Sequence, residues 1–481
     1  MSQQMYELQG DVSHSGRLYN KDLAPTTIKQ RRWGTYNFAA LWIGMAHCVP
    51  TYMLAGGLIA LGMDWLQALI TITLGNLIVL VPMLLNSHPG TRYGIPFPVF
   101  ARASFGVFGA NIPAILRAIV ACGWFGIQTY IGGAALNHFL GALIPGWLNI
   151  GGSFSIAGLS LPGAITFLVF WGFNMYVIYR GMDMVRRFEN WAAPFVIVLA
   201  LILVIWMLDK ANGLGPLLAQ PSKFTNFGDF FKVFIPSLTG MVGFWATLSL
   251  NIPDFTRFGK GQKEQMWGQV LGLPTTMTVF SAMGIIITSA SGIVFGQLIW
   301  DPADLLSKFS NPIVLIISLI GITVATLSVN IAANTVSPAN DFSNLIPKHI
   351  SFKRGAMITG VIGILMMPWK LVADPSGYIF NWLGTYSGFL GPIAGVLIAD
   401  YWVLRRANLK LDDLYTEQGE YRFSGGFNLC AIISLVAGVI VALIGRAVPS
   451  LHILFDYAWF VGFATSFVLY CIIMAGRVRR A

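Results

Sequence analysis

The chain has 481 residues, of which 56% are hydrophobic and only 10% are charged. Apolar runs of about 20 residues, the length that crosses a bilayer as a helix, recur along it, so the composition predicts a polytopic helical membrane protein rather than a soluble one. The formal net charge of +10 does not indicate a nucleic-acid partner, because the basic residues fall in short clusters between apolar runs, as orientation signals do.

Cysteine usage indicates neither disulfides nor a metal site. The four cysteines lie within or beside apolar segments and form no CxxC or Cys/His cluster. They are Cys48, Cys122, Cys430 and Cys471. We expect no cofactor. The first 35 residues are polar, with Arg31 and Arg32 just ahead of the first apolar run, so no cleavable signal is predicted.

Apolar runs bounded by charges or Gly/Pro clusters predict twelve membrane spans. In chain order they cover residues 36–62, 66–87, 108–142, 163–180, 190–208, 231–252, 267–298, 312–343, 355–371, 376–400, 428–446 and 454–475. The predicted organisation is an N-terminal tail, two repeats of five spans, a linker with two further spans, and a C-terminal tail. Their bounds are 1–35, 36–208, 209–400, 401–475 and 476–481.

The basic residues distribute unequally over the two predicted sides. With the N-terminus inside, 23 of the 30 Lys and Arg residues fall on the inner side, six fall on the outer side, and Arg117 lies within a span. Adding or removing one span would reverse every later assignment and destroy this asymmetry. We therefore predict twelve spans with both termini cytoplasmic.

The first and sixth spans are interrupted by glycine and proline, at residues 42–57 and 236–254. Glycine and proline leave some backbone groups without helical hydrogen bonds, and a bilayer tolerates such groups only where they face protein or a water-filled cavity. Two such segments five spans apart predict an inverted five-plus-five repeat with broken helices at the binding site, with kinked helices and no site as the alternative. The turn-rich basic segment 88–106 predicts a short re-entrant or interfacial element that helps close the inner gate.

Aromatic and amide side chains within spans predict a site for a planar solute. Trp124 and Gln128 lie four apart, so on a helix they share a face and offer an indole wall beside an amide. Trp245 supplies a second indole, and Asn330 and Asn334 supply further neutral amides. Two indoles can sandwich a flat ring while amides satisfy its imide and urea edges without bringing charge into the bilayer. The alternative is that each residue fills a helix interface.

Charged residues in or near the spans are few. Arg117 is expected to reach back toward the inner interface, and Asp254 and Arg257, three apart, are expected to pair as a gate or anchor. Asp341 and Asp400 lie at predicted inner span ends, where solvated positions are expected. No carboxylate proton relay is visible.

Five segments resemble the nucleobase:cation symporter family, which includes hydantoin transporters, allantoin permeases and plant plastid nucleobase transporters. They are Trp124–Gln128, Phe244–Arg257, Asn330–Pro338, Met367–Lys370 and Leu390–Gly395. The resemblance, from about Arg31 onward, implies a leucine-transporter-type repeat plus two helices, alternating access, and uptake of a planar nitrogenous ring with a cation. It also implies that Trp124 and Trp245 stack on the ligand while Gln128 and Asn334 hydrogen-bond to it.

Two departures from the family pattern bear on coupling and substrate. The hydantoin transporter holds sodium at positions matching Gly44, His47, Ala325, Ser328 and Val329. The last is a threonine there, and a valine has no oxygen to offer a hard cation. We therefore expect H⁺ coupling in preference to Na⁺ coupling, with His47 as the candidate proton carrier and a neutral His47 bonded to a backbone carbonyl as the alternative.

The second departure is Cys48, which follows His47 where allantoin permeases usually have Asn. We add Cys48 to the candidate substrate-binding residues, and the lost amide disfavours allantoin. Segments 51–62 and 121–124 look closer to the plant nucleobase transporters, although those have Glu in place of Gln128.

The sequence therefore predicts a secondary active importer of a uracil-type nucleobase, monomeric, in a bacterial-type inner membrane with lipid around it. Uptake of allantoin or hydantoin, and sodium coupling, are the alternatives, and the sequence does not separate uracil from thymine or cytosine. A channel or membrane enzyme is disfavoured, since neither a catalytic cluster nor a continuous polar pore face is present.

Overall fold

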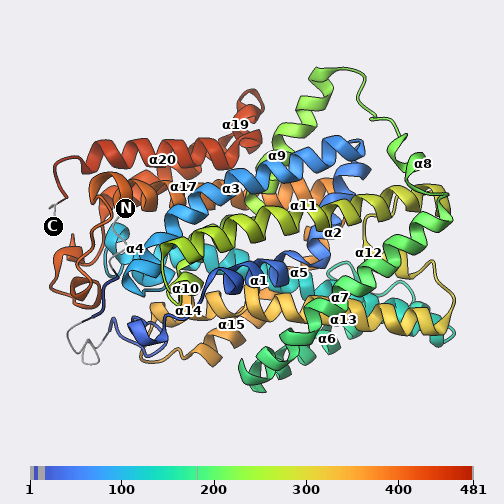
Figure 1. Cartoon of the computed structure of the whole chain (residues 1–481), viewed down its shortest axis with the longest axis horizontal. Coiled ribbons are helices and arrows are strands. Elements are labelled where there is room, and N and C mark those ends of the chain that lie inside the picture. Colours follow the sequence, from blue (N-terminus) through green and yellow to red (C-terminus); the bar gives the residue numbers. More distant parts are fainter. Residues whose placement is uncertain (1–4, 9–16, 181, 479–481) are drawn as a thin grey trace.

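The computed structural model describes residues 5–8, 17–180 and 182–478, and its long helices lie side by side in one bundle (Figure 1). The long elements are α1 (Thr35–Ala46), α2 (Val49–Ala60), α3 (Trp65–Tyr93), α5 (Asn111–Leu143), α6 (Leu161–Arg180), α7 (Met182–Lys210), α9 (Phe227–Asn251), α11 (Gln262–Phe295), α13 (Pro312–Asn334), α14 (Val336–Leu345), α15 (Phe352–Leu365), α17 (Gly384–Ile398), α18 (Leu429–Leu443) and α20 (Ala458–Met474).

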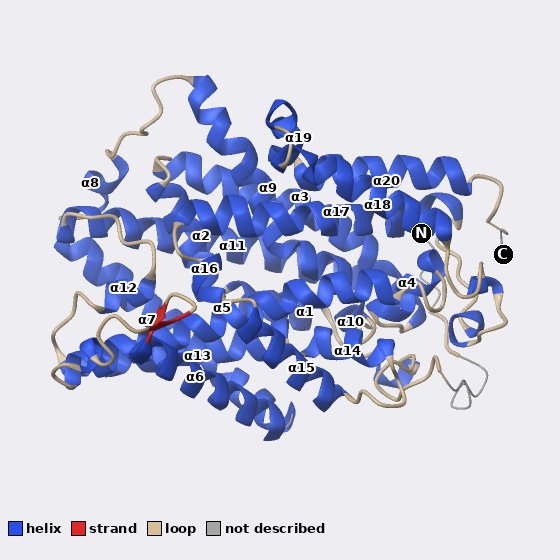
Figure 2. Ribbon diagram, turned by 180° about the vertical axis from the view of Figure 1, so that it is seen from behind, coloured by secondary structure: helices blue, strands red, loops and turns tan. Residues whose placement is uncertain are grey.

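Shorter elements connect them. They are α4 (Phe97–Phe105), α8 (Leu214–Leu218), α10 (Pro253–Thr256), α12 (Pro302–Leu306), α16 (Pro368–Leu371), α19 (His452–Asp456), and the π-helical segments η3 (Gly377–Leu383) and η4 (Ala399–Leu404) that flank α17. A small antiparallel hairpin of β1 (Ser155–Ile156) and β2 (Leu159–Ser160) lies between α5 and α6 (Figure 2).

The predicted fold class is confirmed. Eight helices of the described residues are long and apolar enough to cross a membrane, or ten if each of two bent pairs is one span. Helix occupies part of each of the twelve predicted ranges. The count of twelve, the five-plus-five repeat and its bounds stay predictions, and the basic residues Arg479 and Arg480 lie outside the described part of the chain.

Polar caps begin several long helices. The Asp64 carboxylate accepts hydrogen bonds from the backbone N–H of Leu66 and Gln67 at the start of α3. The Asn311 side chain accepts from Ile313 N at the start of α13, where Pro312 occupies the first turn. Such caps satisfy amide groups that a helix leaves unpaired, so these residues define where the spans begin.

The predicted break in the first span is confirmed. α1 ends at Ala46 and α2 begins at Val49, with an angle of 59° between them. Cys48 is extended (φ −134°, ψ 159°), and Pro50 sits in the first turn of α2. A proline in a first turn lacks only an amide that would be unpaired anyway, so it starts α2 without penalty after the chain has turned.

The sixth span is interrupted within the predicted range 236–254, but at its proline end and not at its glycines. α9 runs unbroken from Phe227 to Asn251, and the interruption comes at Ile252, before α10. A Cβ at Gly240 would lie 3.2 Å from the carbonyl oxygen of Ile379, and one at Gly243 would overlap the Ser387 hydroxyl. These glycines therefore permit α9 to approach η3 and α17 closely rather than weakening the helix.

The segment 88–106 is mostly helical and buried, so the interfacial alternative predicted for it is wrong, whereas the re-entrant alternative and its role at the inner gate stay predictions. α3 continues to Tyr93, and Gly94 then adopts a left-handed conformation (φ 72°) that ends it. Every residue of α4 is buried. α4 is thus an internal element, held against α5 and the 405–422 connection.

Two groups of helices meet where the site lies. α5 packs against α6, α13, α14 and α15, whereas α1 packs on α11 and α3 packs on α9. The first-span break and α9 therefore face α5 and α13 across the middle of the molecule.

Candidate functional site

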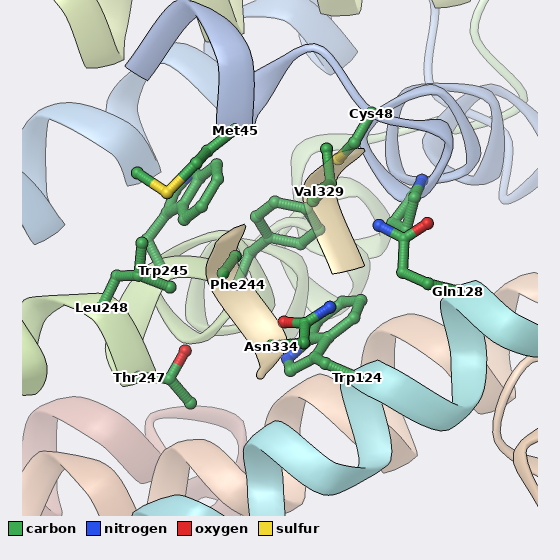
Figure 3. Close-up of a pocket in the computed structure, with 12 residues that line it drawn as sticks. Met45, Cys48, Trp124, Gln128, Phe244, Trp245, Thr247, Leu248, Val329 and Asn334 are labelled. Atoms are coloured by element: carbon green, nitrogen blue, oxygen red, sulfur yellow. The ribbon is translucent and has the colours of Figure 1, made fainter. Parts of the chain in front are cut away.

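A pocket lies where the first-span break, α5, α9 and α13 converge (Figure 3). Its lining comprises Met45, Cys48, Pro50, Trp124, Gln128, Phe244, Trp245, Thr247, Leu248, Val329, Ala333 and Asn334. The structure thus brings together five of the six predicted substrate-binding residues, from segments far apart in the chain. The cavity volume of about 30 Å³ is room for a water molecule or two. A six-membered ring fits only after lining side chains move.

Phe244 occupies the space between the two indoles. Its ring centroid lies 5.2 Å from that of Trp124 and 5.0 Å from that of Trp245, edge-to-face with both. Figure 3 shows the Phe244 ring in the middle of the pocket, between Trp245 and Trp124. An aromatic side chain of the protein therefore lies between the two indoles, where a sandwiched substrate ring was predicted.

An aromatic wall holds Trp124 in place. The rings of Tyr378, Trp382 and Tyr386 lie 6.1, 6.2 and 6.4 Å from it, all in edge-to-face geometry. On the other side of the pocket, Trp42 meets Trp245 edge-to-face at 5.2 Å. These contacts restrict both indoles, so each offers a surface of fixed orientation.

Polar groups of the pocket are few and neutral. Gln128 is buried, and its Oε1 has no hydrogen-bond partner within the described residues. A buried amide oxygen without a partner costs free energy, so this atom favours a ligand or water that donates to it. The Asn334 amide, the Thr247 hydroxyl and the Cys48 thiol also line the pocket, and the indole Nε1 atoms of Trp124 and Trp245 likewise have no hydrogen-bond partner within the described residues.

Asn330, predicted to bind substrate, is not among the lining residues. Its Nδ2 donates to the Phe125 carbonyl (3.3 Å), Thr129 Oγ1 (3.2 Å) and Asn174 Oδ1 (3.0 Å). Its Oδ1 accepts from Asn334 Nδ2 at 3.1 Å. Asn330 therefore ties α13 to α5 and α6 and orients Asn334 from behind the pocket.

The predicted cation-site residues come from α1 and α13, which contact each other. Val329 lines the pocket, whereas Ala325 lines a second cavity that also reaches Cys48. His47 ends α1 and lies on Phe280, with 3.9 Å between ring centroids. Gly44 and Ser328 are half-buried and line neither cavity.

Arg117 does not reach the inner interface, which corrects that prediction. It is fully buried and forms an ion pair with Asp341, 2.6 Å between Nη1 and Oδ2, with neither side chain exposed. The expectation that Asp341 is solvated is wrong for the same reason. Arg117 lies on α5 and Asp341 on α14, so the packing of these two helices brings the residues together. Their spacing in the sequence does not indicate that they pair.

Asp400 is also buried rather than solvated. Its carboxylate accepts hydrogen bonds from Ser104 (3.1 Å), Arg405 Nε (2.8 Å) and Tyr470 (2.8 Å). Three donors, of which Arg405 is also a positive partner, offset the cost of removing the charge from water. Asp400 thus joins α4, η4 and α20.

Asp254 and Arg257 do not pair within the described structure. The Asp254 carboxylate accepts from Phe97 N (2.8 Å) and Ser337 Oγ (2.5 Å), while Arg257 donates to the Asp22 carbonyl (3.0 Å). The two side chains are instead tied to different segments. Asp254 connects α10 to α4 and α14.

Sequence reasoning missed Phe244, Thr247 and Leu248 as lining residues. All three lie within the Phe244–Arg257 segment that carries the family resemblance, beside the selected Trp245. Leu248 lies three residues after Trp245, and Phe244 lies three before Thr247 and four before Leu248, so helical spacing relates these positions once one of them is placed in the pocket.

Comparison with known proteins gives a family. A family model for permeases of cytosine/purines, uracil, thiamine and allantoin matches residues 25–462. An allantoin permease of Bacillus subtilis (strain 168) is 46% identical over 468 residues, covering 97% of this chain and 95% of the relative. A purine-uracil permease of Arabidopsis thaliana is 43% identical over 472 residues, covering 95% of this chain and 78% of the relative.

A solved structure shares the fold along the whole chain. It is a nucleobase-cation-symport-1 family transporter in a closed conformation with bromovinylhydantoin bound. The TM-score is 0.77 at 26% identity, and the match covers 95% of each chain.

Proposed function

Because the chain belongs to the permease family for cytosine/purines, uracil, thiamine and allantoin, we propose that it imports a uracil-type nucleobase by alternating access. It is an integral membrane transporter, not an enzyme. The proposed setting is a bacterial-type inner membrane with both termini cytoplasmic, which the 23-to-6 asymmetry of basic residues supports.

The three-ring arrangement of Trp124, Phe244 and Trp245 is the observation that carries the proposal. The ring of Phe244 lies between the two indoles, edge-to-face with both, so the side chains there already surround one six-membered ring. A planar substrate ring entering the gap would displace Phe244 and stack on indole faces. The free Gln128 oxygen would then accept from an imide or urea N–H.

The pocket has few polar side chains, which favours a ring without a polar side arm. Gln128, Asn334 and Thr247 can satisfy the edges of one pyrimidine ring, and one Asn334 donor is already committed to Asn330. A ureido arm on the ring would bring more donors and acceptors, each costly if unpaired in this apolar pocket. Cys48 offers only a weakly polar thiol.

Allantoin is the second candidate substrate. The 46% identity with the allantoin permease of Bacillus subtilis favours it specifically. A hydantoin core would use the same stacking gap and the same Gln128 oxygen.

Competition in proteoliposomes tests the substrate class. We expect unlabelled uracil to suppress uptake of labelled uracil more strongly than thymine, cytosine, allantoin or hydantoin does. Allantoin as the strongest competitor would select the second candidate, and no accumulation of any of these rings against a gradient would refute the proposed function.

Gln128→Leu provides the matched variant for this panel. It keeps the side-chain size but removes the free oxygen, so competitors with an imide edge should lose the most affinity. Near-normal uracil uptake by this variant would exclude Gln128 as a ligand-binding group.

For coupling, we propose that the transporter uses H⁺ rather than Na⁺. A sodium site of the family type draws on oxygen ligands from the first-span break and α13. Here Val329 contributes no side-chain oxygen, which leaves the Ala325 carbonyl and the Ser328 hydroxyl on α13. His47 is the histidine at the break and is the proposed proton carrier.

An imposed pH gradient tests this coupling. Uptake into vesicles, inside alkaline, is expected to proceed in sodium-free buffer and to collapse with a protonophore. Val329→Thr restores a hydroxyl and should make uptake sensitive to sodium, and His47→Gln should reduce the response to pH. A wild-type requirement for sodium with indifference to the pH gradient would contradict the proposal.

A further inference from the structure

A second, much larger cavity also borders the first-span break. Its volume is about 800 Å³, and it is enclosed by α2, α7, α11, α12 and α13. Cys48 lines both cavities. At its deep end the cavity reaches Phe280 and Ala325, beside the residues considered for the coupling cation.

The cavity walls are aliphatic and aromatic, and the cavity opens sideways. Ile202 on α7 and Ile317 on α13 both line it, yet they are 57% and 44% exposed. Residues that line a cavity and also face outward mark its mouth. Because α7 and α13 present further exposed isoleucines on the same flank, such as Ile205 and Ile313, this mouth faces the lipid-covered surface.

One end of the cavity differs in chemistry from the rest. Lys210 at the end of α7 and Lys308 after α12 line it there, with Trp206 and Phe309 in ring contact at 5.2 Å. Figure 1 places α7, α12 and α13 together, toward the end of the bundle opposite the chain termini. Tryptophan with lysine at a bundle end is typical of the headgroup level of a membrane.

The lysines give this end a positive character. Lys308 is exposed, and Lys210 is half-exposed, with the Asp209 carboxylate 3.7 Å from its Nζ. Asp209 and the exposed Asp304 of α12 offset part of the lysine charge, but neither carboxylate lines the cavity. The cavity therefore combines a long apolar interior with a cationic rim, which complements an amphiphile with an anionic head.

We propose that this cavity binds an acyl chain of a phospholipid with an anionic headgroup, whose phosphate lies against Lys210 and Lys308. The chain enters between α7 and α13 and extends toward Cys48. The inference depends on the membrane location of the protein and not on the proposed substrate.

Lipid retention by the purified full-length protein tests the site. Native mass spectrometry in an uncharged detergent would compare phosphatidylglycerol with phosphatidylcholine of the same acyl chains. We expect a preference for phosphatidylglycerol of about fivefold per lysine. Lys210→Gln with Lys308→Gln should abolish the preference, while Lys232→Gln, an exposed lysine outside the cavity, should keep it.

A second pair of variants tests the apolar interior. Ser318→Phe on the cavity wall should reduce binding of both lipids, whereas Leu201→Phe, exposed on α7 but outside the lining, should not. A phosphatidylglycerol preference that survives the double lysine variant, or wild-type lipid binding by Ser318→Phe, would overturn the proposal.

Photocrosslinking of the unmodified protein keeps the inference testable if a variant fails to fold. A phosphatidylglycerol with a diazirine in its acyl chain should label peptides of α7 and α13. Labelling confined to other helices would equally overturn the assignment.

Discussion

Trp124→Ala is expected to raise the Kd for the transported ring by between about fivefold and 150-fold, because stacking on one aromatic face is worth about 1–3 kcal/mol. Trp245→Ala should have an effect of the same order, since it removes the opposite wall. Equilibrium binding of a radiolabelled ring to purified protein measures both changes. Each variant must first elute as a monodisperse peak, because removing a buried indole also removes packing.

Trp267→Ala is the matched control. Trp267 is 59% exposed on α11 and contributes nothing to the pocket, so its loss should leave the Kd unchanged. Near-normal binding by both pocket variants would refute the stacking site.

Phe244→Ala separates displacement from stacking. If the substrate displaces the Phe244 ring from the gap, the alanine variant no longer has to move it and should bind at least as tightly as the wild type. A loss as large as that of Trp124→Ala would instead make Phe244 a wall of the site.

Asp341→Asn is expected to lower the free energy of unfolding by about 3–5 kcal/mol, because it leaves the Arg117 guanidinium buried without its counter-charge. The pair is fully buried, and Arg117 Nε, Arg117 Nη2 and Asp341 Oδ1 have no other hydrogen-bond partner in the described part of the chain. The temperature at which half of the monodisperse protein is lost on graded heating should fall accordingly, and this temperature is the measurement. Arg117→Met should be similarly destabilising.

The double variant Arg117→Met with Asp341→Leu decides whether the effect comes from an unpaired charge. Replacing both partners with apolar residues removes the buried charges together, so much of the stability should return. Lys232→Met is the control, since its 3.0 Å pair with Asp229 is exposed and should contribute little. Single variants as stable as the wild type would show that the pair carries no net stability.

Several features of this protein follow from local sequence chemistry. Apolar runs long enough to cross a bilayer determine the membrane class, because backbone groups in lipid must pair within a helix. The position of Pro50 after His47 and Cys48 determines the break between α1 and α2. The four-residue spacing of Trp124 and Gln128 places both on one face of α5, and both line the pocket.

Other features were decided by tertiary structure. Arg117 and Asp341 are 224 residues apart, and Asn330 and Phe125 are 205 apart. No hydropathy period relates such positions, so the buried ion pair and the role of Asn330 behind the pocket could not be predicted. The glycines of α9 likewise look like helix breakers in the sequence, yet they serve its close approach to η3 and α17.

At the centre of the site, too, the sequence determined some features and the tertiary structure determined others. The sequence alone determined that two indoles and neutral amides lie within spans, but the content of the gap between the indoles depended on the rotation of α9. That rotation points Phe244 between Trp124 and Trp245, and it is determined by how α9 packs against α3 and α17. Packing between helices balances many weak contacts from distant segments, so only the folded chain determines which side chain occupies the gap.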